Sequence, residues 1–179
     1  MTELQASGSE NIQELAVLYE RISKVFSDSG SLVNCRDVLH RYTGDDWSVF
    51  VEYDNTTYKR VRLPNMCNDD FEFVLICWDK GQRSPIHDHP DNGCLVKVLQ
   101  GELCEELYKK QRSLEGQYKR IGSRNNRAGD VSYMEKNVVI HRISNVSSNE
   151  MEGCKTVSLH IYSPPKFKYT IVQEKELVE

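Results

Sequence analysis

Two histidines, His87 and His89, lie one residue apart in the stretch SPIHDHPDNGC, residues 84–94. Residues at positions i and i+2 of a β-strand point to the same face, so on a strand both imidazoles could bind one metal ion. A third histidine, His141, lies in the strand-like run VVIHRIS. Any one of them alone would be better explained as an ordinary strand residue. The three together predict a metal centre with three imidazole ligands.

The spacing around the first two histidines resembles the first sequence motif of the cupins, a superfamily of jelly-roll barrels. Counted from Gly81 to Gly101, it reads Gly, five residues, His, one residue, His, four residues, Cys, six residues, Gly. Cys94 stands where cupins usually carry a glutamate. This spacing makes three unrelated strand histidines the weaker interpretation.

The second cupin motif is matched less completely. Gly129 opens it, and three residues separate His141 from Asn145, as the motif requires. Residues 135–137, Glu-Lys-Asn, replace its Pro-x-Gly element with slightly altered spacing. We therefore expect His141 on a strand, after a turn that differs from the usual one.

The missing carboxylate bears on the identity of the metal. Two histidines and one carboxylate are typical of non-haem iron(II) oxygenases, whereas three histidines also suit a catalytic zinc. A third neutral imidazole leaves the full positive charge on the metal. Such a centre favours an anionic soft ligand such as a substrate thiolate, whose pKa the metal would lower. The residues alone leave iron and zinc both open.

Hydrophobic periodicity indicates helices first and strands afterwards. Helices are predicted in ENIQELAVLYERISKVF (10–26), capped by Ser9, in VLHRY (38–42) and in DDWSVFVEY (45–53). From about Tyr58 the chain consists of short β-rich runs: FEFVLICW, CLVKVLQ, ELCEELYK, GQYKRIG, DVSYME, VVIHRIS and KTVSLHIY. The predicted fold is mainly β, a cupin jelly-roll β-barrel with an N-terminal helical segment. We expect a single cupin domain over 1–179, with helices in 1–54, the barrel in 55–170 and a charged tail in 171–179.

Composition narrows the class of partner. The 179 residues carry 23 basic and 27 acidic side chains, a net charge of −4, without a long basic run, so nucleic acid is not an expected partner. The polar, acidic start does not resemble a secretory signal, and no apolar run reaches membrane-spanning length. We therefore expect a cytoplasmic monomer without a membrane partner. Its six cysteines, which contain no C-x-x-C pair, are expected to be free thiols.

Ordered residues beyond the cupin motif resemble the thiol dioxygenases, most closely the cysteine dioxygenase family. The resemblance runs from about Tyr58 to Pro165 and includes the segments YKR (58–60), ICWDKG, HDHPDNGC, KVLQGEL, IHRISNVS and SLHIYSPP. It implies that His87, His89 and His141 hold iron(II), and that L-cysteine and O2 give cysteine sulfinic acid, a step of cysteine catabolism and taurine biosynthesis. It also implies a cis peptide at Ser163-Pro164.

The resemblance assigns Cys94 to a thioether bond with Tyr162, a protein-derived cofactor beside the metal. Without it, Cys94 would be a buried and inert thiol. In SLHIY, Ser158, His160 and Tyr162 alternate with apolar residues and so share one face, which is costly to bury unless its members are hydrogen-bonded. They resemble the family's Ser-His-Tyr relay. The competing interpretation is a solvated outward face.

Arg60 and Tyr58 are the candidates for binding a substrate carboxylate. A guanidinium can form two charge-assisted hydrogen bonds to a carboxylate. In relatives that prefer 3-mercaptopropionate, this position commonly resembles glutamine and the cross-linking cysteine is often absent. Arg60 together with Cys94 therefore indicates L-cysteine as the substrate. A surface arginine is the alternative, adopted here for Arg62. Trp78 is expected to pack against the site.

Two alternatives remain beside a cysteine-specific enzyme. One is a dioxygenase for another small thiol, such as 3-mercaptopropionate or cysteamine, although cysteamine has no carboxylate for Arg60. The other is a non-catalytic metal-binding cupin. Mammalian-type relatives continue further beyond the SPP segment than this sequence, so we expect the outer wall of the pocket to be built differently here.

Overall fold

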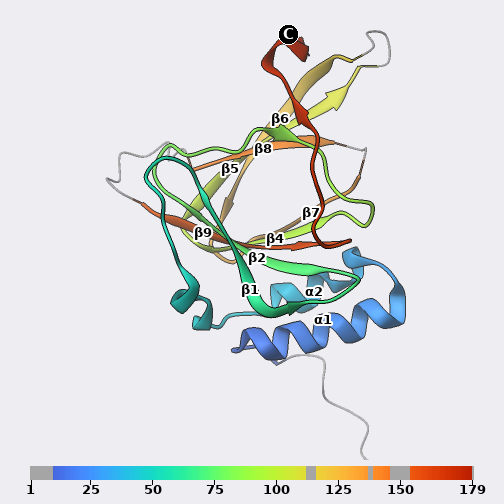
Figure 1. The fold of residues 1–179 in the computed structure, drawn as a ribbon, viewed down its shortest axis with the longest axis vertical. Coiled ribbons are helices and arrows are strands. Elements are labelled where there is room, and N and C mark those ends of the chain that lie inside the picture. Colours follow the sequence, from blue (N-terminus) through green and yellow to red (C-terminus); the bar gives the residue numbers. More distant parts are fainter. Residues whose placement is uncertain (1–9, 112–115, 137–138, 146–153, 179) are drawn as a thin grey trace, which may run out of the picture.

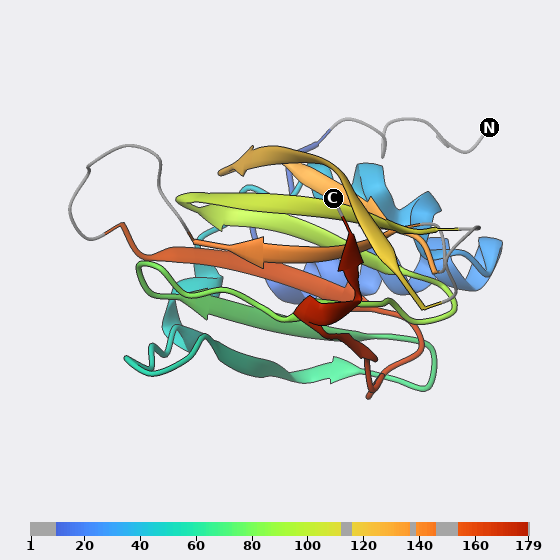
Figure 2. The ribbon, with the colours of Figure 1, turned by 90° about the horizontal axis from the view of Figure 1, so that it is seen from above.

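The computed structural model describes residues 10–111, 116–136, 139–145 and 154–178, which form two facing β-sheets with helices on one side (Figure 1). The five-stranded sheet has the order β1 (Lys59–Cys67), β2 (Glu72–Trp78), β9 (Thr156–Tyr162), β4 (Cys94–Gln100) and β7 (Val131–Met134). The six-stranded sheet has the order β10 (Ile171–Val172), β3 (Ile86–His87), β8 (Ile140–Ser144), β5 (Glu102–Lys110), β6 (Tyr118–Arg127) and β11 (Leu177–Val178). The strands of both sheets lie broadly along one axis and mostly alternate in direction (Figure 2).

The helical segment is shorter than the sequence predicts. Helix α1 is Leu15–Ser29 and α2 is Arg36–His40, preceded by the 3₁₀ turn η1 (Leu32–Cys35). The predicted cap, Ser9, lies outside the described residues; Asp46 instead accepts a hydrogen bond from the backbone N–H of Leu15 at 2.8 Å. The third predicted helix is only the 3₁₀ turn η2 (Asp46–Phe50).

Each predicted β-rich run contains a strand, and four further strands were not identified by periodicity. These are the edge strand β1, the two-residue β3, and β10 and β11 near the end of the chain. The residues predicted as a charged tail thus pair with the sheet: β10 with β3, and β11 in parallel with β6. Periodicity did not predict these two short strands, because they flank charged side chains at 174–176, which form the 3₁₀ turn η3 (Glu174–Glu176).

Two apolar clusters lie on opposite faces of the five-stranded sheet. The outer one joins α1 and α2 to residues such as Phe73, Leu159 and Ile161, and in Figure 1 these helices cover that face. The inner one fills the space between the sheets and includes Trp78, Cys94 and Tyr162. The predicted helical scaffold therefore supports one face of the sheet, while the site occupies the other.

Within the described part of the chain, no helix is long and apolar enough to cross a membrane. All six cysteines lie among the described residues, and no disulfide bond joins any two of them in this structure.

Candidate metal centre

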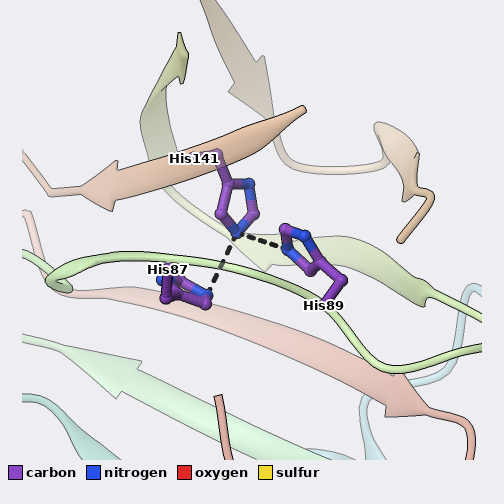
Figure 3. A group of neighbouring side chains, drawn as sticks. All are labelled: His87, His89 and His141. Carbon is purple, nitrogen blue, oxygen red and sulfur yellow. Dashed lines mark hydrogen bonds between the residues drawn. The ribbon is translucent and has the colours of Figure 1, made fainter. Parts of the chain in front are cut away.

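The three predicted histidines come together between the sheets (Figure 3). His87 ends β3 and is the direct partner of His141 on β8. His89 follows two residues later and lies outside any strand, so the prediction that both residues of the His-x-His pair share a strand is wrong. The chain bends after His87 and brings the His89 ring toward His141 from the side.

The nitrogens of the three rings converge in a way that fits a bound metal. His141 Nε2 lies 2.9 Å from His89 Nε2 and 3.3 Å from His87 Nε2. The other nitrogen of His141 faces Glu105, and that of His87 faces the carbonyl of Pro85 at 2.9 Å. With those outer nitrogens protonated, the Nε2 lone pairs face one another, an arrangement that a cation stabilises.

Burial disfavours the charged form of two of these imidazoles, those of His87 and His89, and a metal ligand must be neutral. Burial, followed by the charge of His141, lowers the pKa of His87 to about 3. Burial also lowers the pKa of His89 well below its ordinary value. The donor set of three neutral imidazoles suits iron, zinc or copper.

Glu105 on β5 is a functional residue that the sequence analysis missed. Its carboxylate is 1% exposed and receives hydrogen bonds from His141 Nδ1 at 2.6 Å, Arg124 Nε at 2.5 Å and Asn126 Nδ2 at 3.1 Å. Burial alone would raise its pKa, but the hydrogen bonds from His141 and Arg124, together with the charge of Arg124, lower it to about 2. Glu105 thus fixes the orientation and tautomer of His141.

A signal for Glu105 was present in the sequence. In the predicted strand ELCEELYK it alternates with the same phase as Leu103 and Leu107, which points it to the interior. An acid in an apolar register needs a buried partner, and His141 supplies it.

The predicted row on β9 faces inward, so the alternative of a solvated face is wrong. Ser158, His160 and Tyr162 are all buried. Ser158 Oγ lies 2.9 Å from Trp78 Nε1 and 2.9 Å from His160 Nε2. His160 Nδ1 lies 3.3 Å from the hydroxyl of Tyr162, which also accepts a hydrogen bond from Arg60 Nη1 at 3.3 Å.

The donors and acceptors of this row define a direction. The indole N–H of Trp78 can only donate, so Ser158 accepts it and donates its own hydrogen to His160 Nε2. In a neutral imidazole the proton then lies on Nδ1, which donates to Tyr162. Burial, and then Arg60, lowers the pKa of His160 well below its ordinary value and keeps the ring neutral. The Tyr162 oxygen accepts two hydrogen bonds, so its own hydrogen is free to point into the pocket.

Cys94 and Tyr162 are direct cross-strand partners of β4 and β9. Side chains at such positions are neighbours on one face of the sheet. Cys94 Sγ lies 4.0 Å from His160 Nδ1, and burial raises the pKa of the thiol.

A small cavity of about 10 Å³ lies beside His87 and His160. Its walls include five residues of the predicted site, namely Tyr58, Arg60, His87, His160 and Tyr162. The other lining residues are Ile76, Trp78, Ser84, Ile143 and Tyr169. The Arg60 guanidinium carbon lies 5.1 Å from the centroid of the Tyr162 ring, and Arg60 as a whole residue is exposed. Tyr58 stacks on Trp78 with ring centroids 4.6 Å apart, and Arg62 is half-exposed and bound to Glu72 at 2.7 Å, as expected of a surface arginine.

Tyr169 was missed because the sequence analysis gave its segment no structure. Its ring centroid lies 5.1 Å from that of His87. Burial, and then the neighbouring Tyr169 phenol, raises the pKa of Tyr58 to about 12. The peptide bond Ser163-Pro164 is cis, as the resemblance implied.

The sequence and the fold were compared with known proteins. Residues 5–173 match the family model "Cysteine dioxygenase type I". Cysteine dioxygenase type 1 of Danio rerio is 32% identical over 168 residues, which cover 92% of this chain and 80% of the relative. The Bos taurus protein of the same name is 34% identical over 156 residues, covering 84% and 74%.

Solved structures extend the likeness to the fold. A Klebsiella pneumoniae protein with a double-stranded β-helix domain superposes with a TM-score of 0.53 at 16% identity, covering 73% of this chain and 96% of that protein. The predicted jelly-roll β-barrel fold is therefore confirmed. With the family model spanning nearly the whole sequence and a three-histidine site in place, the chain belongs to the cysteine dioxygenase type I family.

Proposed function

We propose that this protein is an iron(II)-dependent thiol dioxygenase that oxidises L-cysteine to cysteine sulfinic acid. The observation that carries the proposal is the Arg60 guanidinium, which reaches the Tyr162 hydroxyl at the wall of a cavity that His87 also lines. The reaction balances as RSH + O2 → RSO2H: the sulfur loses four electrons, dioxygen gains them, and both oxygen atoms form bonds to sulfur.

His87, His89 and His141 are the residues that would hold the iron. When bound, iron(II) supplies the redox chemistry that lets a thiolate react with dioxygen. Because all three ligands are neutral, an anionic thiolate is favoured over a neutral thiol at this centre.

Arg60 and Tyr58 would bind the substrate carboxylate. Both line the cavity, and Tyr58 is held in place by stacking on Trp78. A charge-assisted pair of hydrogen bonds from a guanidinium contributes roughly 1.5–3 kcal/mol. L-Cysteine and 3-mercaptopropionate carry this carboxylate, whereas cysteamine does not.

Tyr162, oriented by His160 and Ser158, would hold or move a proton beside the reacting sulfur. Its hydroxyl hydrogen is free of the relay and can donate to a ligand in the cavity. His160 stays neutral and serves to orient the phenol.

A thioether between Cys94 Sγ and a ring carbon of Tyr162 is part of the proposal. Its formation removes one hydrogen from the thiol and one from the ring, a two-electron oxidation for which dioxygen is the oxidant. The bond would fix the phenol ring without changing its hydroxyl contacts. A Cys94→Ser variant should have the mass expected from its sequence, whereas cross-linked wild-type protein should be two hydrogens lighter and migrate faster in a denaturing gel.

The decisive experiment is oxygen uptake by iron(II)-loaded protein with L-cysteine, 3-mercaptopropionate or cysteamine, beside a chelator-treated control. Iron-dependent uptake that prefers L-cysteine and yields one sulfinic acid per dioxygen would support the proposal. A preference for 3-mercaptopropionate would retain the chemistry and replace the substrate. Protein that holds iron but consumes no oxygen with any thiol would instead be a non-catalytic metal-binding cupin.

A further inference from the structure

The segment 165–170 crosses the mouth of the cavity as an irregular strap between β9 and β10. Near its start, the backbone N–H of Lys166 donates to the buried carboxylate of Glu72 at 2.5 Å. At its end, the backbone N–H of Thr170 donates to Asp88 Oδ1 at 2.6 Å, and β10 then pairs with β3. Attachment at both ends gives the strap a defined position over the cavity.

Tyr169 is the residue of this strap that points into the site. Its ring lies against His87 with centroids 5.1 Å apart, and its phenol is close enough to Tyr58 to raise the pKa of that hydroxyl. Tyr169 therefore stands next to both a proposed metal ligand and a proposed carboxylate-binding residue.

A second hollow of about 350 Å³, open to solvent and called the vestibule below, has Lys166, Phe167 and Tyr169 of the strap in its wall. Its lining includes three basic side chains, those of Arg60, Arg62 and Lys166, together with the acidic Glu72 and the uncharged Val74, Phe167 and Tyr169. Among the described residues, Arg60 and Tyr169 are the two that line both this vestibule and the inner cavity. The Arg60 side chain and the Tyr169 ring therefore form the partition between the two spaces.

We propose that Tyr169 is a specificity-determining residue that closes the carboxylate end of the cavity and restricts the site to free small thiols. The inference rests on the proposed function, because it assumes that the substrate carboxylate lies at Arg60 and Tyr58. A thiol extended through its carboxyl group, such as the dipeptide L-cysteinylglycine, would have to pass through the space that the Tyr169 ring fills. Removal of the ring would join the cavity to the vestibule, where the terminal carboxylate of the dipeptide would meet Arg62 and Lys166.

The test compares L-cysteine with L-cysteinylglycine in wild-type protein, Tyr169→Ala, Tyr169→Phe and Phe167→Ala. Phe167 is the matched control, since it is an aromatic residue of the same strap that lines the vestibule and not the inner cavity. Affinities are measured by calorimetry on iron(II)-loaded protein without oxygen, so the readout does not depend on turnover. Sulfinic acid formation in air is measured in parallel.

We expect wild-type protein to prefer L-cysteine, and Tyr169→Ala to reduce that preference by about tenfold or more, as opening a fitted pocket by several carbon atoms should. Tyr169→Phe and Phe167→Ala should keep the preference within about twofold, because both retain the ring at position 169. If Tyr169→Ala does not fold, which its thermal midpoint will show, Tyr169→Leu opens the partition in part and should shift the preference in the same direction.

Two results would overturn the inference. An unchanged preference in the opened variants, with L-cysteine still bound and oxidised, would refute the role of Tyr169 and leave the proposed function intact. Iron-loaded wild-type protein that binds neither thiol and consumes no oxygen would refute both.

Discussion

The two faces of β9 are equally buried and yet have opposite chemistry. Every residue from Thr156 to Tyr162 is buried. On one face, Val157, Leu159 and Ile161 pack against the helices, where nondirectional burial of apolar surface stabilises the fold. On the other, Ser158 and its polar neighbours lie between the sheets, where each group needs a partner at the right distance and angle.

Because the residues of β9 alternate between its two faces, this one strand contributes to stability with one face and to the site with the other. An apolar face tolerates changes of shape at a cost that scales with the lost volume, whereas a polar network depends on each of its members. Substitutions on the two faces should therefore have separable effects on stability and on function.

The largest effect is expected at the inner side of the barrel, from His141→Ala. The substitution removes one of three ligands and leaves Glu105 without its hydrogen bond from His141, so iron retention and oxygen uptake should both be lost. Metal analysis after desalting, together with oxygen electrode traces, tests this. A His141→Ala protein with full iron content and full uptake would refute the metal assignment. His40→Ala, at an exposed histidine, is the matched control.

Leu159→Ala on the outer face should reduce the free energy of unfolding by roughly 2–5 kcal/mol, through lost apolar burial and the cavity left behind. Iron content and thiol preference should be preserved below the unfolding transition. Urea unfolding followed by fluorescence gives the first quantity, and metal analysis the second. Loss of iron from folded Leu159→Ala would show that the two faces are not separable.

Arg60→Gln should weaken apparent affinity for L-cysteine by about ten- to a hundredfold, the cost of a charge-assisted contact. Affinity for cysteamine should change little, because it has no carboxylate. Arg62→Gln is the control, since Arg62 lies two residues along the same strand but is bound to Glu72. Equal losses for both thiols in Arg60→Gln would contradict a carboxylate contact.

Acid should destabilise the metal-free protein. The pKa of His87 is lowered to about 3 in the fold from an ordinary 6.5, so between these values the unfolded chain binds more protons. His87 therefore does not reduce the free energy of unfolding above about pH 6.5, and it reduces that free energy increasingly as the pH falls toward 3. Glu105 adds a second loss between its ordinary 4.5 and about 2. Denaturant unfolding at a series of pH values checks the sign, and a Glu105→Gln variant should lack the lower part of the dependence.

The smallest effect is expected from Ser158→Ala. It leaves the buried Trp78 N–H without its acceptor, at a cost of about 1–3 kcal/mol in the free energy of unfolding, and it removes the group that orients His160. Iron content should be unchanged while the pH profile of turnover shifts. Ser158→Thr retains the hydroxyl and should restore the profile; if both variants match wild type, the relay has no functional role.

The sequence by itself determined the features that depend on local order. The spacing of the His-x-His pair, the position of His141 on a strand and the inward phase of Ser158, His160 and Tyr162 all follow from motif and period-two alternation. The period of the hydrophobic pattern shows which residues share a face of a strand. This inference is reliable where one face of the sheet is buried.

Only the tertiary structure decided the contacts between residues far apart in the sequence. Asp46 binds the start of α1 and the Tyr42 hydroxyl, which explains why a predicted helix is only a turn. The buried ammonium group of Lys97 on β4 donates to three backbone carbonyls at the end of α2. Neither the contacts of Asp46 nor those of Lys97 can be predicted from neighbouring residues in the sequence, because they form only once the helices pack on the sheet.

The site shows the same division. The sequence identified His141 but not Glu105, which meets it only when β5 and β8 pair, and it identified Arg60 but not Tyr169, which the strap brings from beyond β9. Side-chain type and spacing state what chemistry a residue can do. Which residues surround it depends on strand register and loop path, and these are set by the burial of the whole chain at once.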